Sequence, residues 1–300
     1  MVPGPLSGDC FPYLGVPGDH VLMRSKSYVK WLGDKTKLTP AIRNRLPAKH
    51  EGYIEPFVGS GALFFETLPQ CALLADLNER LIRTHLAVRD RPEEVIEMLG
   101  SYRNDKNFFN FMRARSKSID AASDVEVAAW LIFLSKTAHS GLYRVNSKNQ
   151  FNVPFGNYEA RRFFDADKLR ACSAALQGAS IECASFETSM SRAQPGDFIY
   201  ADPPYVKVTT TSFVGYTANG FGGEQHRRLR DLAIELRRRG VFVLISNSAA
   251  PAVRDLYGGK GFHVEEISVR RSIAVKGRHR GTVKELVISN YPPPYAQNLT

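Results

Sequence analysis

Short apolar runs, separated by glycine-rich or polar segments, are the most regular feature of this chain. Such runs occupy residues 52–55, 71–75, 180–186 and 197–201, and their composition predicts strands. A further run, residues 241–246, lacks the alternation of apolar and polar positions that a half-exposed strand shows. That pattern is typical of a central strand in a parallel sheet, where both faces are buried.

Helical patterns fill several of the intervals between these strands. Residues 224–239 show the clearest one, because four apolar residues line one face and Gly240 follows as a stop signal. The other predicted helices are residues 38–46, 62–68, 92–99 and 125–136. Residues 263–268 and 285–290 resemble an antiparallel pair that closes the sheet, with the basic segment 270–280 between them.

The order of these elements predicts an α/β fold with a mixed, mostly parallel sheet. Sheet-forming segments flank a helical and irregular middle, which we interpret as an insert that recognises a partner. The predicted division is a flexible N-terminal extension (1–25), a catalytic domain (26–80 and 179–291), the insert (81–178) and a C-terminal tail (292–300).

A glycine-rich loop lies between the first predicted strand and the helix after it. Gly59 and Gly61 allow the backbone to approach a ligand closely at the start of that helix. A dinucleotide-binding fingerprint needs a third glycine where this chain has Phe64, which argues against NAD. Asp76 ends the next strand, where a carboxylate can accept hydrogen bonds from both hydroxyls of a ribose. A tight turn with a helix-capping aspartate would explain the same residues.

The segment Asp202-Pro203-Pro204-Tyr205 follows an apolar strand, at the carboxyl edge of the sheet where ligands bind in such folds. Its prolines fix the backbone and remove two N–H donors. The carboxylate of Asp202 and the carbonyl of Pro203 can then hold one amino group and direct its lone pair at a methyl donor. Tyr205 offers a flat face on which an extruded base can stack. The tetrapeptide therefore predicts methyl transfer to an exocyclic amine.

Composition supports a polyanionic partner, since the formal net charge is +10. The excess is concentrated in two segments: residues 1–50 hold 8 Lys/Arg and 3 Asp/Glu, and residues 224–281 hold 13 and 6. Charge distributed in this way indicates a basic groove or face. A hydrophobic content of 43% excludes wholesale disorder.

The cysteines predict no zinc site, because they are far apart and include no C-x-x-C pair. We expect Cys10, Cys71, Cys172 and Cys183 to be reduced thiols of a cytoplasmic protein. No apolar run is long enough to span a bilayer, so no membrane contact is predicted. The N-terminus lacks the pattern of a signal peptide.

Six sequence blocks, taken in their order, resemble the Dam-like (alpha-group, D12 class) family of DNA adenine-N6 methyltransferases. These blocks are Lys30–Lys35 (KWLGDK), Glu55–Gly61 (EPFVGSG), Asp76–Asn78 (DLN), Arg144–Asn146 (RVN), Phe151–Gly156 (FNVPFG) and Asp202–Tyr205 (DPPY). The resemblance covers roughly residues 26–291. It implies the S-adenosylmethionine-dependent methyltransferase (Rossmann-like) fold, with the insert as target-recognition domain. It also implies methyl transfer from S-adenosylmethionine, without a metal, to N6 of a flipped-out adenine in double-stranded DNA.

The resemblance also implies residue roles. The cofactor would be bound by Trp31, Lys35, Glu55, Pro56, Phe57, Gly59, Gly61, Asp76, Ser185, Phe186 and Asp202. The flipped adenine would be held by Asp202, Pro203, Pro204 and Tyr205. DNA would be contacted by Lys30, Ser140, Leu142, Arg144, Asn152, Pro154 and Tyr158. Arg144 is the best candidate for a bidentate contact to a guanine edge.

The target sequence stays open at this point. Family members that read GATC usually carry Tyr-Asn-Gly where this chain has His139-Ser140-Gly141, so we expect GATC or a related short site. His139 itself fits either a DNA contact or a capping residue. Further candidates are Phe213 and Tyr216 as a lid, and Arg270, Arg271, Lys276, Arg278 and Arg280 as phosphate contacts.

Two other functions fit the same residues. Adenine in RNA is an alternative substrate, since the motif reads a base and not a sugar. A DNA-binding protein without catalysis is the other alternative, although the cofactor and catalytic positions are intact together. We expect a monomer in solution, with one or more copies on each DNA, in a cytoplasm of bacterial or phage type.

Overall fold

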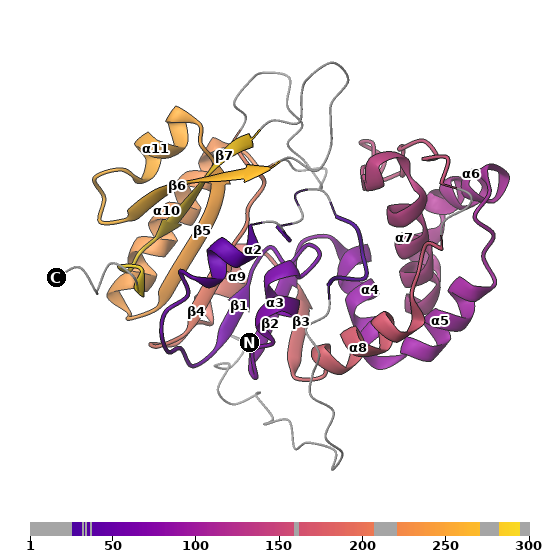
Figure 1. Ribbon diagram of the computed structural model, residues 1–300, viewed down its shortest axis with the longest axis horizontal. Helices are drawn as coiled ribbons and strands as arrows, with labels where there is room; N and C mark the ends of the chain where they lie inside the picture. Colours follow the sequence, from indigo (N-terminus) through magenta and orange to yellow (C-terminus); the bar gives the residue numbers. More distant parts are fainter. Residues whose placement is uncertain are drawn as a thin grey trace, which may run out of the picture.

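The computed structural model describes residues 26–31, 33, 35–36, 38–158, 162–206, 221–270 and 282–294. Figure 1 shows a twisted sheet with helices on both faces and a helical body beside it. The predictions for the N-terminal extension, for Phe213 and Tyr216, and for the basic residues 271–280 lie outside the described residues.

A single seven-stranded sheet organises the described part of the chain, in the order β3-β2-β1-β4-β5-β7-β6. Its strands are β1 (Tyr53–Glu55), β2 (Ala72–Asp76), β3 (Ala179–Cys183), β4 (Phe198–Ala201), β5 (Phe242–Ser248), β6 (His263–Arg270) and β7 (Thr282–Ser289). Strands β1 to β5 pair in parallel, and β7 lies antiparallel between β5 and β6. The predicted mixed, mostly parallel sheet is confirmed, as is its closing antiparallel pair.

The helices are α2 (Thr39–Arg43), α3 (Ala62–Thr67), α4 (Glu79–Asp90), α5 (Pro92–Gly100), α6 (Lys106–Ala114), α7 (Asp124–Thr137), α8 (Ala166–Leu176), α9 (Phe186–Ser191), α10 (Gly223–Arg238) and α11 (Pro251–Tyr257). One sequence prediction was wrong here, because the strand expected over residues 180–186 ends at Cys183. The hydroxyl of Ser185 caps the backbone N–H of Thr188 at 3.2 Å, so Phe186 begins a helix instead.

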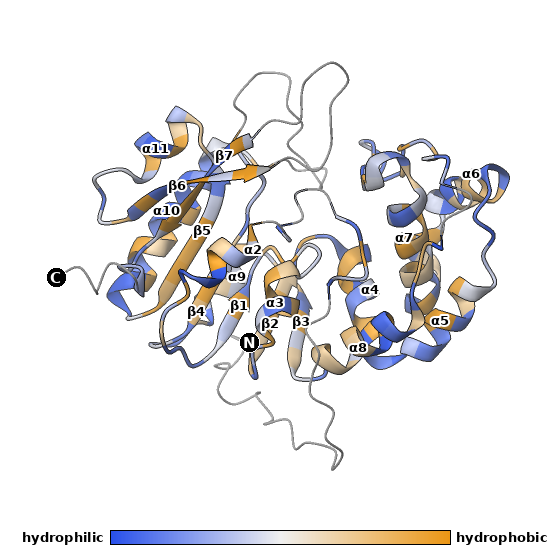
Figure 2. Cartoon of the chain, viewed as in Figure 1, coloured by the Kyte–Doolittle hydropathy of each residue, from blue (hydrophilic) through white to orange (hydrophobic). Residues whose placement is uncertain are grey.

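Side chains of successive strand residues enter two separate cores, one on each face of the sheet. Tyr53 and Tyr200 belong to the core shared with α2, α3 and α4, whereas Ile54 and Ile199 belong to the core shared with α9, α10 and α11. Both faces of the central strands are therefore covered, which explains their continuous apolar runs. Figure 2 shows apolar residues along these strands and along α7.

The helical body is built around α7, which is buried on nearly all sides. Ser123 and Glu126 form a capping box at its start, and the indole of Trp130 donates to the carbonyl of Met112 at 2.7 Å. Helix α4 packs against α7 and α8 as well as against β2 and β3, so it joins the helical body to the sheet. The domain boundary predicted after residue 80 falls inside α4, and the division stays a prediction.

Two of the cysteines are free thiols, Cys172 and Cys183. Cys71 is disulfide-bonded, which contradicts the prediction that all four cysteines are reduced. Spacing along the chain did not reveal this, because it does not tell which thiols meet in a fold. Within the described segments, no helix combines the length and apolar character that a membrane crossing requires.

Candidate active site

The predicted cofactor and catalytic residues meet at the carboxyl ends of the parallel strands. Glu55 ends β1, Asp76 ends β2 and Asp202 follows β4, and these three strands lie side by side in the sheet. The edge of a parallel sheet is where loops diverge and leave room for a ligand. The structure thus brings together residues that are up to 147 positions apart in the sequence.

The glycine loop between β1 and α3 is held through both backbone groups of Gly59. The backbone N–H of Gly59 donates to Asp76 Oδ2 at 3.2 Å, and its carbonyl lies 2.9 Å from His85 Nε2. Burial lowers the pKa of His85 to about 4, so this imidazole is neutral. Its Nε2 therefore donates to Gly59, and its Nδ1 accepts from the hydroxyl of Tyr28. Sequence reasoning missed His85, which carries no motif of its own.

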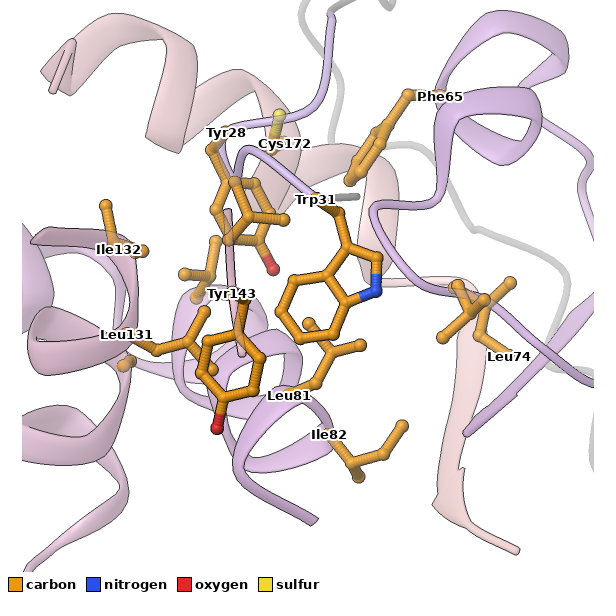
Figure 3. Close-up of a cluster of buried hydrophobic side chains, with 14 of the residues drawn as sticks. Tyr28, Trp31, Phe65, Leu74, Leu81, Ile82, Leu131, Ile132, Tyr143 and Cys172 are labelled. Carbon is orange, nitrogen blue, oxygen red and sulfur yellow. The ribbon is translucent and has the colours of Figure 1, made fainter. Parts of the chain in front are cut away.

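Trp31 covers this loop. Both Gly59 and Gly61 have positive φ, at 49° and 67°. A Cβ on Gly59 would lie 3.1 Å from Cδ1 of the indole, so the backbone approaches the ring closely. Figure 3 shows Tyr143 next to the indole of Trp31. The two rings are stacked, with centroids 4.8 Å apart and an angle of 20° between their planes. Tyr143 thereby joins the insert to the predicted cofactor loop.

Asp76 is oriented by two backbone donors. Its Oδ1 accepts from the N–H of Asn78 at 2.9 Å, and its Oδ2 accepts from Gly59. Burial raises the pKa of Asp76, and these N–H donors oppose that rise. The next residue, Leu77, leaves 56% of its surface exposed, which is unusual for a large apolar side chain in this molecule. Leu77 is a candidate ligand contact that sequence reasoning did not single out.

Glu55 links the start of the glycine loop to helix α3. Glu55 is 2% exposed, and its Oε1 accepts from the N–H of Phe64 at 2.9 Å and from the hydroxyl of Tyr53. Burial raises the pKa of Glu55 to about 8. These contacts tie the end of β1 to the first turn of α3. Pro56 follows Glu55 directly and begins the loop.

An aromatic cluster lies beside the loop. The rings of Phe57 and Phe186 are stacked, with centroids 5.5 Å apart, and Phe221 meets both at 5.5 and 5.7 Å. Phe57 and Phe186 were predicted to border the cofactor together with Ser185, and they are brought together. Phe221 was not predicted.

Asp202 sits in a network of polar side chains. Lys35 Nζ lies 3.2 Å from Asp202 Oδ1, and the hydroxyl of Ser246 donates to the same oxygen. Ser246 is also hydrogen-bonded to the hydroxyl of Tyr200, at 3.1 Å. Burial raises the pKa of Asp202, whereas Lys35 and Ser246 lower it. Ser246 and Tyr200 were not predicted, because only the pairing of β4 with β5 brings Ser246 to the site.

Tyr205 and Pro204 of the tetrapeptide also contact neighbouring side chains. Lys35 Nζ lies 4.0 Å from the centroid of the Tyr205 ring, and the Tyr205 hydroxyl donates to Glu285 Oε2 at 2.7 Å. The carbonyl of Pro204 accepts from the ring of His226, whose pKa burial lowers to about 4. Among the described residues, no group of three His, Cys, Asp or Glu side chains is arranged to hold a metal ion.

The residues predicted to contact DNA gather on a short hairpin of the insert. Arg144 Nε donates to Asn152 Oδ1 at 2.7 Å on its surface, and Val145 pairs with Phe151 behind them. The neighbouring predicted residues are Ser140, Leu142, Pro154 and Tyr158. Lys30 reaches this region from the N-terminal segment, since its side chain lies against Gly141.

Comparison with known proteins gives the family. The D12 class N6 adenine-specific DNA methyltransferase family matches residues 31–273. The type II methyltransferase M1.LlaDCHI of Lactococcus lactis subsp. cremoris is 40% identical over 273 residues, which cover 89% of this chain and 95% of that protein. The type II methyltransferase M.MjaIII of Methanocaldococcus jannaschii is 34% identical, over 90% of this chain and all (100%) of that protein. The DNA adenine methylase of Escherichia coli (strain K12) is 34% identical, over 89% and 95%. The family expected from the sequence is thus confirmed, and this chain belongs to the D12 class N6 adenine-specific DNA methyltransferases.

Proposed function

We propose that this protein methylates the N6 amino group of a flipped-out adenine in double-stranded DNA, with S-adenosylmethionine as methyl donor. The observation that carries the proposal is the network around Asp202, in which Ser246 and Lys35 hold one carboxylate oxygen beside the ring of Tyr205. Family membership supports adenine and DNA as the substrate. The geometry supports an active enzyme over a binding protein that has lost catalysis.

The residues around the glycine loop fit S-adenosylmethionine. Gly59 has no side chain, so its backbone can lie close to Trp31 and to a ligand. The carboxylate of Asp76 suits the hydroxyls of a ribose. The stacked rings of Phe57 and Phe186 suit the adenine of the cofactor. Ser185, Gly61, Pro56 and Glu55 complete this proposed site. Glu55 supports α3 there, since its Oε1 accepts from both Phe64 and Tyr53.

The chemistry follows from the weakness of the nucleophile. The lone pair of an exocyclic adenine amine is delocalised into the ring, so the nitrogen attacks poorly until its hydrogens are held. The carboxylate of Asp202 and the carbonyl of Pro203 would each accept a hydrogen bond from the amine and favour a pyramidal nitrogen. The carbonyl of Pro204 is already engaged by His226. S-adenosylmethionine supplies the methyl group when bound, and the carboxylate of Asp202 stabilises the positive charge that develops on the nitrogen.

Lys35 favours the ionised form of Asp202. Burial raises the pKa of Asp202, and the Lys35 ammonium opposes that rise, which favours the ionised carboxylate that can accept a hydrogen bond. The same ammonium lies over the ring of Tyr205, where an extruded adenine would stack. We infer that Lys35 shifts along Asp202 as the base enters.

Target recognition is proposed for the hairpin that carries Arg144 and Asn152. The Asn152 amide oxygen accepts from the guanidinium Nε at 2.7 Å and so helps to orient Arg144, whose planar fork suits a guanine edge. Lys30, Ser140, Leu142, Pro154 and Tyr158 would form the surrounding DNA-contacting surface. We propose GATC or a related short site as the target, and a monomer that acts in the cytoplasm without a metal.

The proposal is tested by the transfer of radiolabelled methyl groups to unmethylated duplex DNA and to RNA, followed by sequencing of the methylated bases. Wild type is expected to label adenine in DNA at one short sequence, and Asp202→Ala is expected to label nothing. Asp231→Asn, which changes an exposed aspartate on α10, is the matched control and should behave like wild type. Labelling of RNA alone, or DNA binding without any transfer, would refute the proposal.

A further inference from the structure

The turn that carries the tetrapeptide is held by three consecutive residues of the neighbouring strand β5. Ser246 donates to the carboxylate of Asp202, and Asn247 accepts from the N–H of Val206 at 3.1 Å. Ser248 donates to the carbonyl of Val206 at 2.9 Å. The backbone directly after Tyr205 is therefore fixed through both its donor and its acceptor.

The ring of Tyr205 has a second anchor at its far end. Its hydroxyl donates to Glu285 Oε2 at 2.7 Å, and Glu285 lies opposite Ser248 in the pairing of β5 with β7. The backbone and the hydroxyl of Tyr205 are thus both fixed to adjacent strands of one sheet. Lys35 Nζ lies over one face of the ring. The hydrogen bond from the Tyr205 hydroxyl to Glu285 fixes where that face lies.

A ring that is fixed only at the backbone can rotate about its Cα–Cβ bond. A base that stacks on it then binds more weakly, because the ring loses this conformational freedom. A hydrogen bond at the far end removes that freedom before the base arrives, and a carboxylate acceptor makes the bond stronger than a neutral one. We propose that Glu285 is a positioning residue that fixes Tyr205 as the stacking surface for the target adenine. This inference rests on the function proposed above.

Glu285 has two properties that must be separated. It accepts the hydrogen bond of Tyr205, and it places a negative charge near Asp202, whose pKa that charge raises. Glu285→Gln keeps an acceptor oxygen and removes the charge, whereas Glu285→Ala removes both. Tyr205→Phe removes the donor and leaves Glu285 in place.

The test compares methyl transfer to unmethylated duplex DNA by wild type, the three single variants and the Tyr205→Phe/Glu285→Ala double variant. Glu285→Ala and Tyr205→Phe should each lower kcat/KM about tenfold, as the loss of one charge-assisted hydrogen bond predicts. Glu285→Gln should lose clearly less than Glu285→Ala, because it keeps an acceptor oxygen, and the double variant should be no slower than Tyr205→Phe. Losses that multiply in the double variant, or a Gln variant as slow as the Ala variant, would overturn the proposal.

A second readout reports on the ring itself. With 2-aminopurine in place of the methylated adenine, stacking on a fixed ring quenches the extruded base, so Glu285→Ala should raise fluorescence at saturating protein and Glu285→Gln should not. Glu266→Gln is the matched control, since Glu266 lies on the neighbouring strand β6 and is paired with Lys284 of β7 and Arg254 of α11. An inactive wild type would refute the proposed function, whereas an active wild type matched by Glu285→Ala in both readouts would refute only the positioning role.

Discussion

His85 Nε2 lies 2.9 Å from the carbonyl oxygen of Gly59, so a buried histidine of α4 fixes the peptide of the glycine loop. The preceding peptide is held by Asp76, which accepts from the N–H of Gly59. The two bonds together define the floor of the proposed cofactor site. His85 is 1% exposed and therefore acts on a ligand only through the loop.

Removal of this donor should weaken cofactor binding. We expect His85→Leu to lower the affinity for S-adenosylhomocysteine about tenfold, because one buried carbonyl loses its hydrogen bond. Isothermal titration calorimetry measures the affinity directly. His263→Leu, which changes an exposed histidine on β6, should bind like wild type. Equal affinities for His85→Leu and wild type would show that the loop holds its shape without His85.

Stability should fall on acidification because of the same residue. The pKa of His85 is lowered from 6.5 to about 4 by burial, so the unfolded chain binds a proton that the folded chain does not bind in this range. The contribution is fully present above pH 6.5 and is lost as the pH falls from about 6.5 to about 4. Thermal unfolding at pH 7 and pH 5 should show a smaller decrease in Tm for His85→Gln than for wild type. An equal decrease would contradict the neutral, buried state of His85.

Gly59→Ala should impair the cofactor site more than the fold. The residue has a φ of 49°, and a Cβ would lie 3.1 Å from the indole of Trp31. A non-glycine residue in this region costs on the order of 1 kcal/mol, and Trp31 must also move. We expect a loss of S-adenosylhomocysteine affinity with a decrease in Tm of only a few degrees. The control is Gly100→Ala, where a Cβ meets no atom within 4 Å.

The pH dependence of catalysis should report on Ser246. This hydroxyl lowers the pKa of Asp202, so Ser246→Ala should raise that pKa. Because Asp202 is proposed to act as a carboxylate, the acidic limb of the kcat/KM profile should move to higher pH. Ser101→Ala, on the exposed end of α5, should leave the limb in place. A profile that drops at all pH values without shifting would mean that Ser246 orients Asp202 without changing its ionisation.

The parts of the site that were predictable from sequence are those carried by local signals. Asp202-Pro203-Pro204-Tyr205 and Asp76 each follow an apolar strand directly, so the pattern of strands already placed them at one edge of the sheet. Ser246 depends on the pairing of β4 with β5, and Glu285 depends on the pairing of β5 with β7; no local pattern records either register. His85 lies on α4 as one polar residue among many, and only the packing of α4 against the sheet reveals its partner.

The error at residues 180–186 has the same physical origin. In a short apolar stretch of sequence, the last residue of a strand cannot be told from the first residue of a helix by hydrophobicity alone. Ser185 was the available signal, because a serine one position before a helix caps it. The residue had been assigned to the cofactor site, and its capping role does not exclude that assignment.

Arg144 provides the test of target recognition. If its guanidinium reads a guanine edge, Arg144→Ala should relax specificity at one position, by about 1–3 kcal/mol, and leave the other positions unchanged. Asn152→Ala should have a weaker effect at the same position, since Asn152 only orients Arg144 through a 2.7 Å hydrogen bond. The measurement is the methylation rate on duplexes that carry each single base change in the site found by sequencing. An equal loss on every duplex, together with a smaller dependence of binding on salt, would instead identify Arg144 as a phosphate contact.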